Sequence, residues 1–264
     1  MNKPETEHRN PVITPDKIEI DFSAVSTWLK CGKQYEFRYV NGKKSIPGIA
    51  LLEGSAHHKA MEYNNRHKLA KGFDLKAKVV TEFFHEDLNV RVKKEEQIAW
   101  GEENVDTVSK RAATLHQDYF FSVAPTINPE LIEHKFERDF MLDGLKIKLY
   151  GTIDLTEVEG LYDYKTCKSK WSQSDVDNDL QLSLYSLVKS KPSVGIIMFV
   201  KKSIPEVGIV KSTRSKGQIL WALKVVKSIA SAIQAGYYPL AEPSSWACNP
   251  KFCGYWKDCR GKYE

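Results

Sequence analysis

Hydrophobic and polar residues alternate along two consecutive stretches in the middle of the chain. In residues 145–155 the odd positions are Leu, Ile, Leu, Gly, Ile and Leu, whereas most even positions are polar. A period of two is typical of β-strands that bury one face. A short turn then leads into residues 161–166, where Asp163 and Lys165 share one face. We therefore predict two neighbouring strands, with the side chain of Asp154 on the non-core face of the first.

Helical and strand patterns surround this pair of strands. Apolar residues spaced three and four apart predict helices before it and after it. The expected class is α/β, with a central mixed β-sheet flanked by helices, an N-terminal helical region and a C-terminal cysteine-rich tail. The expected helices cover about residues 23–40, 54–70, 75–96, 102–122, 177–190 and 214–235, and the expected strands about residues 131–141, 144–157, 160–167, 193–201 and 206–212.

The organisation along the chain predicts one large domain between two terminal segments. Residues 1–20, which contain three prolines and many charges, are expected to be a disordered lead-in. Residues 21–240 are expected to form the domain, and residues 241–264 a tail that packs with Cys31. The longest apolar run, Val194 to Val200, is too short to cross a membrane, and the lead-in lacks the apolar core of a signal sequence. We expect a cytoplasmic protein with no membrane partner.

Two carboxylates and an ammonium group can converge across the two predicted strands. Asp154 and Asp163 are suited to hold a hard divalent ion, which can bring water to a phosphodiester and stabilise the charge that develops. Lys165 can contact the phosphate, or orient or deprotonate the water. Ordinary edge charges of a hairpin are the alternative, and an Asp-x-Lys pattern alone favours that alternative.

Two further segments carry polar residues that can reach the same site. The helix expected over residues 54–70 contains His57 and His58, and either could be a structural histidine or a ligand for a metal such as manganese. In a later predicted helix, Gln181 and Tyr185 lie one turn apart beside the apolar stripe. They could face the metal site or form the polar shoulder of a packed helix.

The ordered set of short motifs resembles the RecB-like branch of the PD-(D/E)xK nuclease superfamily. The motifs are Gly-x-x-x-His (Gly54, His58), Gly-x-x-Asp (Gly151, Asp154), Asp-x-Lys (Asp163, Lys165) and Gln-x-x-x-Tyr (Gln181, Tyr185). The resemblance implies a metal-dependent deoxyribonuclease with Lys165 as its catalytic lysine, and with Gln181 and Tyr185 in DNA contact and site organisation. The implied ligands of Mg²⁺ or Mn²⁺ are His58, Asp154, Asp163 and the backbone carbonyl of Tyr164.

Five cysteines form a second pattern: Cys31, Cys167, Cys248, Cys253 and Cys259. The last three lie in a tail with too little apolar periodicity to fold without a cross-link, and a metal is the natural one. Four thiolates could hold a zinc ion. Disulfides are the weaker alternative because no signal sequence indicates an oxidising compartment. Cys167 is expected to be a small apolar strand residue.

The cysteine layout resembles that of RecB-like nucleases that carry an iron–sulfur cluster, including AddB-type subunits and CRISPR-associated nucleases. One cysteine precedes the nuclease core and three follow it. The resemblance implies a 4Fe-4S cluster held by the thiolates of Cys31, Cys248, Cys253 and Cys259. The first gap in the tail is four residues instead of the usual two, which makes Cys248 the departure from the pattern. We favour iron–sulfur over structural Zn²⁺.

The net charge of +5 is unevenly distributed. Residues 199–264 contain eleven Lys or Arg and four acidic residues, a net charge of +7, so the rest of the chain carries −2. This asymmetry favours a surface that tracks phosphates, although solvated lysines would give the same count.

The resemblance implies an exonuclease that acts on single-stranded DNA or DNA ends. The expected setting is recombination, repair, or phage or CRISPR DNA processing, with a recombination or helicase protein as a partner and the host cytoplasm as the location if a phage encodes it. The competing class is a non-catalytic DNA-binding or adaptor module. The intact set of His58, Asp154, Asp163 and Lys165 argues against that class.

Overall fold

The computed structural model describes residues 10–14 and 17–264. The chain divides into two compact units, and each is assembled from segments far apart in the sequence. Unit 1 consists of Met1–Ser45, Phe136–Gly151 and Leu223–Glu264, and unit 2 of Ile46–Lys135 and Thr152–Ala222. The stretch 21–240, expected to be one domain, is therefore distributed over both units.

In the part of the chain that the structure describes, seven strands form a mixed sheet, which confirms the predicted α/β class. The strand order is β1-β2-β4-β5-β6-β7, and β3 pairs with β4. The pairs β2/β4 and β5/β6 are parallel, whereas β4/β5 and β6/β7 are antiparallel. The bounds are β1 Val12–Thr14, β2 Lys17–Ile20, β3 Leu131–Leu142, β4 Leu145–Thr156, β5 Gly160–Cys167, β6 Ser193–Val200 and β7 Glu206–Thr213.

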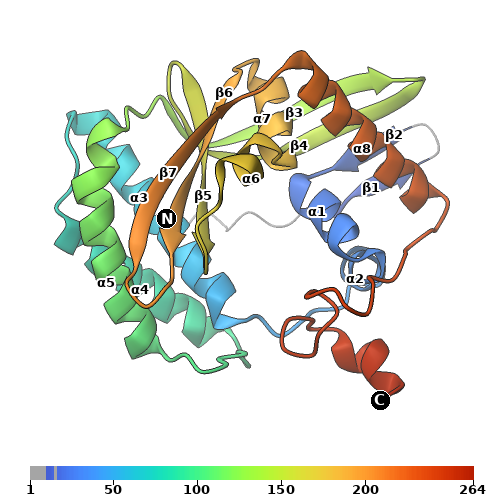
Figure 1. Cartoon of the computed structure of the whole chain (residues 1–264), viewed down its shortest axis with the longest axis horizontal. Helices are drawn as coiled ribbons and strands as arrows, with labels where there is room; N and C mark the ends of the chain where they lie inside the picture. The colour runs from blue at the N-terminus through green and yellow to red at the C-terminus, as the bar shows by residue number, and fades with distance from the viewer. Residues whose placement is uncertain (1–9, 15–16) are drawn as a thin grey trace. The chain divides into compact units, whose positions relative to one another are not determined.

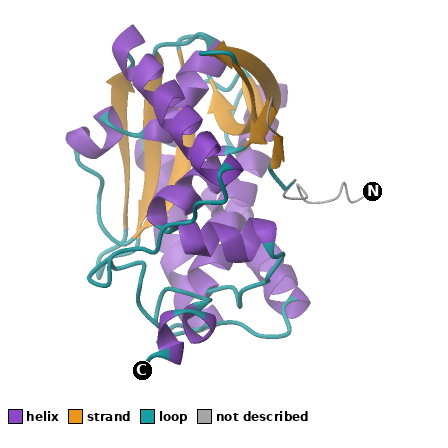
Figure 2. Ribbon diagram, turned by 90° about the vertical axis from the view of Figure 1, so that its right-hand side faces the viewer, coloured by secondary structure: helices purple, strands orange, loops and turns teal. Residues whose placement is uncertain are grey.

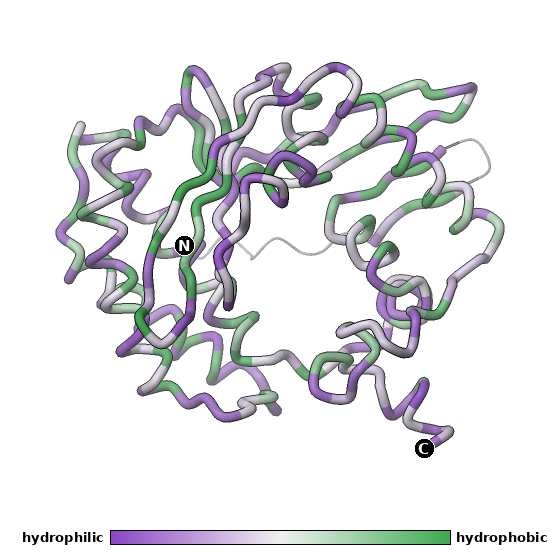
Figure 3. The backbone as a smooth tube through the Cα atoms, in the orientation of Figure 1, coloured by the Kyte–Doolittle hydropathy of each residue, from purple (hydrophilic) through white to green (hydrophobic). Residues whose placement is uncertain are grey.

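Three helices of unit 2 lie beside one another against strands β5 to β7 (Figure 1). They are α3 (Ile49–Lys71), α4 (Ala77–Lys94) and α5 (Val105–Ser122). The tube of this region mixes hydrophilic and hydrophobic positions (Figure 3), and the buried face of α3 includes the polar residues Glu53, His57, Asn64 and Asn65. The apolar face packs on Tyr162, Tyr164, Ile197 and Phe199 of the sheet and forms a continuous core.

The opposite face of these strands carries two shorter helices, α6 (Gln173–Asp177) and α7 (Leu180–Lys189). The helix expected over residues 177–190 is α7, and α6 is an additional short helix that precedes it. Two helices form because Ser172 caps α6 and Asp179 caps α7, each accepting a backbone hydrogen bond in the first turn. The interruption between them lies next to the polar residues of the site.

Unit 1 contains α1 (Phe22–Lys30), α2 (Gly32–Tyr35), a π-helix (Glu36–Val40) and the later part of α8 (Lys216–Gln234). The tail that follows α8 is mostly loop with two short 3-10 helices, Trp256–Asp258 and Arg260–Lys262 (Figure 2).

Part of the predicted lead-in over residues 1–20 is ordered. Residues 1–9 and 15–16 lie outside the described residues, but 12–14 and 17–20 pair as strands. The side chains of Ile18 and Ile20 are fully buried. The alternating Lys17-Ile18-Glu19-Ile20 pattern explains this strand, since Ile18 and Ile20 share its apolar face, and Glu19 on the other face is also buried, paired with Lys17.

The helix expected over residues 23–40 is broken at Cys31, whose backbone is extended. The next residue, Gly32, lies against the chain at Pro239, and a Cβ atom there would come within 2.6 Å of the Pro239 nitrogen. The backbone N–H of Lys33 donates to the Pro239 carbonyl at 3.1 Å. A side chain larger than hydrogen at position 32 would therefore push these segments apart.

The helix predicted over residues 54–70 also has a different start. The helix expected to open at Gly54 begins at Ile49 instead, so Gly54 lies inside α3. A Cβ atom at Gly54 would point toward Thr166 of β5. Among the residues that the structure describes, no helix combines the length and the apolar character needed to span a bilayer.

Candidate active site

The candidate site of unit 2 begins where β4 and β5 stop pairing. In the described register, the ladder between these strands ends at Leu155 and Tyr162. The neighbouring residue Asp154 is buried, and its carboxylate accepts a hydrogen bond from the backbone N–H of Tyr164 at 2.8 Å. The Asp154 carboxylate thus accepts a hydrogen bond of the kind that a backbone carbonyl of the neighbouring strand would accept. It lies between β4 and β5 where the two strands separate.

Asp163, Lys165, Gln181 and Tyr185 form one connected network. The Lys165 Nζ lies 2.7 Å from the Asp163 carboxylate and donates to the Gln181 side-chain oxygen at 2.7 Å. The Gln181 amide nitrogen donates to Asp163 at 2.8 Å and contacts the Tyr185 hydroxyl at 2.7 Å. The Tyr185 hydroxyl donates to the backbone carbonyl of Thr152 at 2.8 Å. Helix α7 therefore fixes both charged groups of β5.

The structure separates the two adjacent histidines of α3. The Nδ1 atom of His58 lies 3.3 Å from the Asp154 carboxylate. His57 is fully buried instead, stacks on Phe199 with ring centroids 4.8 Å apart, and contacts His116 through ring nitrogens at 3.2 Å. His58 is therefore the histidine that reaches the candidate site.

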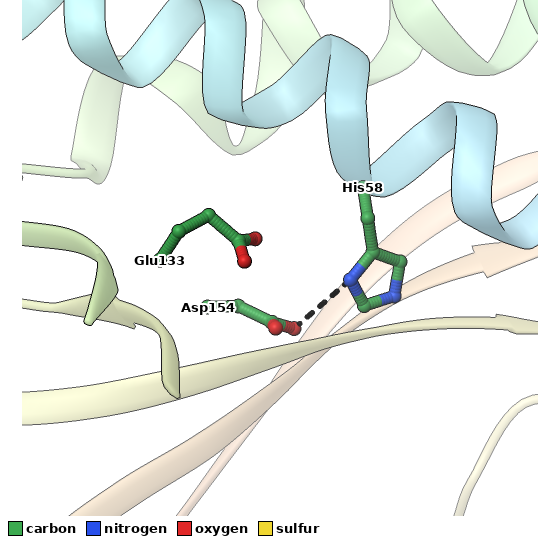
Figure 4. Close-up of side chains that lie close together, drawn as sticks. All are labelled: His58, Glu133 and Asp154. Carbon is green, nitrogen blue, oxygen red and sulfur yellow. Dashed lines mark ion pairs between the residues drawn. The ribbon is translucent and has the colours of Figure 1, made fainter. Parts of the chain in front are cut away.

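Glu133 is a site residue that the sequence analysis missed. Its carboxylate, the Asp154 carboxylate and a ring nitrogen of His58 all lie within 4.8 Å of one another. Figure 4 shows the three side chains converging, with the ion pair between His58 and Asp154 dashed. The backbone of Glu133 has φ +51°, a left-handed conformation unusual inside a strand. This conformation interrupts the alternation of β3.

Two oxygen ligands and one imidazole nitrogen form a donor set that suits Mg²⁺ or Mn²⁺. Asp163 is not part of this close group, since Lys165 and Gln181 hold its carboxylate. The side chain of Tyr164 points into the apolar core, where its hydroxyl contacts Asn65 and Tyr119. Only backbone atoms of Tyr164 are thus available to the site.

The electrostatics of the site reflect its buried charges. Packing disfavours the charged ring of His58, but the carboxylates of Asp154 and Asp163 outweigh this and raise its pKa to about 9. Burial raises the pKa of Asp163 to about 6, although Lys165 opposes the change. Burial, together with the nearby Asp154 carboxylate, raises the pKa of Glu133 to about 7. A cation bound here would relieve the repulsion among these carboxylates.

Behind the site, Glu53 of α3 holds a buried charge network. Its carboxylate contacts Lys201 at 2.7 Å and Arg111 at 2.9 Å, and lies 3.9 Å from His57. Burial alone would raise the pKa of Glu53, but His57 and Lys201 lower it to about 2. Because the folded-state pKa lies below the ordinary 4.5, ionised Glu53 stabilises the fold above pH 4.5, and this contribution disappears as the pH falls toward 2.

We therefore expect Glu53→Gln to be destabilising at neutral pH and much less so in acid. The difference in the free energy of unfolding between the two proteins should be about 3 kcal/mol above pH 5. Denaturant unfolding at pH 6, 4.5 and 3 measures it. The difference should shrink at each step, and an equal difference at all three values would contradict the role of the Glu53 charge.

The cysteines fall into the two units. Cys31, Cys248, Cys253 and Cys259 belong to unit 1, whereas Cys167 lies in β5 of unit 2. All five are half-buried free thiols. Burial raises the pKa of the Cys259 thiol, and so do the neighbouring thiols of Cys31, Cys253 and Cys248. The four cysteines of unit 1 therefore lie near one another.

The tail packs onto the N-terminal helical region within unit 1. The Gln34 amide donates to the Cys253 sulfur at 3.7 Å, and the Tyr255 hydroxyl donates to the Lys43 carbonyl at 2.9 Å. Gly254 lies against Ser45, where a Cβ atom would come within 2.6 Å of the serine Cβ. These contacts bring the tail cysteines toward the break at Cys31.

The sequence matches the model of the PD-(D/E)XK nuclease superfamily over residues 20–260. The chain belongs to this superfamily. The match includes every motif residue of the site, and the mixed sheet flanked by helices is the fold expected of a PD-(D/E)XK nuclease. No curated protein matches the sequence.

Solved structures with a similar fold include a proposed exonuclease from Eubacterium rectale. This PD-(D/E)XK chain resembles it with a TM-score of 0.51 and 16% sequence identity, over 89% of this chain and 86% of that chain. The chain also resembles SSO0001, with a TM-score of 0.43 and 13% identity over 95% and 89% of the two chains. At such low identities the likeness concerns the fold.

Proposed function

We propose that this PD-(D/E)XK protein is a divalent-metal-dependent deoxyribonuclease of the RecB-like branch. The observation that carries the proposal is the convergence of His58, Glu133 and Asp154 beside the Lys165 network. A protein that had kept only the fold as a DNA-binding or adaptor module would have no need to maintain buried, mutually repelling carboxylates next to an ordered lysine.

His58, Glu133 and Asp154 would hold Mg²⁺ or Mn²⁺, and Asp163 and the carbonyl of Tyr164 are further candidate ligands. When bound, such an ion supplies Lewis-acid stabilisation of the phosphodiester and activation of the attacking water. Lys165 stays charged, because burial disfavours the ammonium but Asp163 raises its pKa. It is thus placed to neutralise a phosphate oxygen or to orient the water. Gln181 and Tyr185 act by positioning Lys165 and Asp163.

An exonuclease on single-stranded DNA or DNA ends is the activity that we propose. The motif resemblance supports it, and so does the fold shared with the proposed exonuclease of Eubacterium rectale. The basic C-terminal quarter supplies positive charge for phosphate contacts. We propose work in recombination, repair, or phage or CRISPR DNA processing, in the cytoplasm and beside a helicase or recombination protein.

A 4Fe-4S cluster in unit 1 is the second part of the proposal. Its ligands would be Cys31, Cys248, Cys253 and Cys259. The thiols of Cys31, Cys248 and Cys253 are neighbours of Cys259 within unit 1. The layout of one cysteine before the nuclease core and three after it supports a cluster over structural Zn²⁺, which would use the same four thiolates. Cys167, in the other unit, takes no part.

The direct test is digestion of end-labelled DNA. Protein purified without air should shorten labelled single strands in the presence of Mg²⁺ or Mn²⁺, and EDTA should stop the reaction. Cleavage rates on single strands, blunt duplexes and tailed duplexes show which kind of DNA end is preferred. Circular single strands have no ends, so cleavage of them would indicate endonuclease action. Binding of DNA without any cleavage, under all metals tested, would favour the adaptor alternative.

We expect the metal requirement to depend on His58 and Glu133. His58→Ala and Glu133→Gln should each raise the Mn²⁺ concentration for half-maximal activity by about 10-fold or more, because each removes one ligand atom. The measurement is a metal titration of cleavage. Glu159→Gln, at an exposed turn position, is the matched control. A titration curve for Glu133→Gln that overlays the parental curve would remove Glu133 from the ligand set.

A further inference from the structure

Unit 2 contains an open groove that the catalytic network does not use. Its volume is about 550 Å³, within the range of pockets that hold small ligands. The walls come from the loop after β5 and from the starts of α6 and α7. Residues that line it include Ser169, Lys170, Trp171, Asn178, Asp179 and Leu180.

The groove adjoins the network around Lys165. Its wall residue Leu180 directly precedes Gln181, which contacts both Lys165 and Asp163. Asp179, another wall residue, caps α7 through the Leu182 N–H, and its charge raises the pKa of Lys165. A DNA strand with one phosphate at Lys165 would therefore have an adjoining nucleotide in reach of the groove.

The lining combines one aromatic ring with polar groups. Trp171 is partly exposed, and its backbone N–H donates to the Met198 sulfur at 3.2 Å, which fixes the loop onto β6. Lys170 packs along β7, where its side chain would lie 3.3 Å from a Cβ atom at Gly208. The exposed side chain of Asn178 donates its amide N–H to the Ser174 carbonyl at 2.8 Å and can offer its amide oxygen as an acceptor. The groove also carries the carboxylates of Asp175 and Asp179, so what it offers a nucleotide is a stacking surface and hydrogen bonds to the base, while Lys165 is placed for the phosphate.

We propose that this groove binds the nucleotide next to the scissile phosphate, with its base stacked on Trp171. The inference rests on the proposed nuclease function and deepens it by naming a base-binding site beside Lys165 and the aromatic residue that forms it. A base inside a duplex is already stacked and paired, whereas an unpaired base offers a free face. The groove therefore selects single strands and frayed ends.

The first test measures binding alone. A fluorescein-labelled single-stranded oligonucleotide is titrated in EDTA, without cleavage, against the parental protein, Trp171→Leu and Trp171→Phe. Trp171→Leu should weaken binding between about 5-fold and 100-fold, and Trp171→Phe should stay close to parental because it keeps an aromatic face. Phe121→Leu is the control, since this ring is 88% exposed on α5, on the other face of the sheet. Thermal melting checks that each variant folds.

The second test pairs the protein change with a substrate change. Oligonucleotides with a single abasic residue at each of the terminal positions are cleaved by the parental protein and by Trp171→Leu. At one of these positions, removing the base should raise the KM of the parental protein by the same factor by which Trp171→Leu raises the KM for intact DNA. In Trp171→Leu, removing the same base should leave the KM unchanged. The kcat should remain parental throughout, because Trp171 does not touch the reacting atoms.

These results separate the groove from the nuclease. A parental protein that binds DNA but never cuts it would remove the proposed function, and the binding comparison would still decide the groove. A protein that cuts DNA, with Trp171→Leu equal to parental in binding and in KM, would overturn the groove proposal. Independent, additive losses from the abasic residue and Trp171→Leu would overturn it as well.

Discussion

Lys165→Ala should lower the rate of DNA cleavage by at least about 100-fold, the scale of a lost proton-transfer or charge-stabilising group. The ammonium is held 2.7 Å from both Asp163 and Gln181, so no other side chain can take its position without moving α7. The measurement is the single-turnover rate at saturating Mn²⁺. Asp154→Ala should cause a loss of similar size, because it removes the carboxylate shared by His58 and the Tyr164 backbone.

Two further variants serve as controls for Lys165→Ala. Lys165→Met keeps the length of the side chain and should lose activity equally, while folding better than alanine beside buried Asp163. Lys189→Ala, at the end of α7, changes the charge by the same amount and should cut DNA at the parental rate. Cleavage by Lys165→Ala at the parental rate would remove Lys165 from the mechanism.

If unit 1 holds the proposed iron–sulfur cluster, Cys31→Ser should remove it and destabilise unit 1. Cys31 and Cys248 lie 217 residues apart. For a closed loop of this length, the chain-entropy relation for cross-links gives about 5 kcal/mol. Anaerobically purified parental protein should be brown, with about four irons per chain. The variant should be colourless, with a lower melting temperature for unit 1.

Cys167→Ser is the matched control, since it replaces another half-buried thiol that lies in unit 2. It should keep both the colour and the iron content. Colourless parental protein with one zinc per chain would overturn the cluster assignment. The nuclease proposal would stand, because the ligands proposed for the catalytic metal are different residues.

The spacing of residues within single strands and helices was sufficient to predict how the side chains of the central part of the site are placed. The strand predicted over residues 160–167 is β5 with the same bounds, and its alternation placed Asp163 and Lys165 on one face. The helical spacing of Gln181 and Tyr185 likewise put them on one stripe, which turns toward β5. These predictions succeeded because neighbouring residues in one element decide which face a side chain occupies.

Glu133 could not be found in this way. Period two would give it the face of Leu131, but its left-handed backbone breaks the alternation and lets its carboxylate join Asp154 and His58. A single strained residue leaves no periodic signal. The break at Cys31 was missed for a related reason, since it depends on the close approach of Pro239, more than two hundred residues later.

The order of the segments also has a consequence during protein synthesis. Unit 2 is complete once Ala222 has left the ribosome, whereas unit 1 still lacks Leu223–Glu264 at that moment. The early segments of unit 1, Cys31 among them, therefore lack their partners until the later part of α8 and the tail cysteines have been made. Completion of unit 1 is thus a late event in synthesis, and if the proposed cluster joins Cys31 to the tail, iron can be inserted only after Cys259 has emerged.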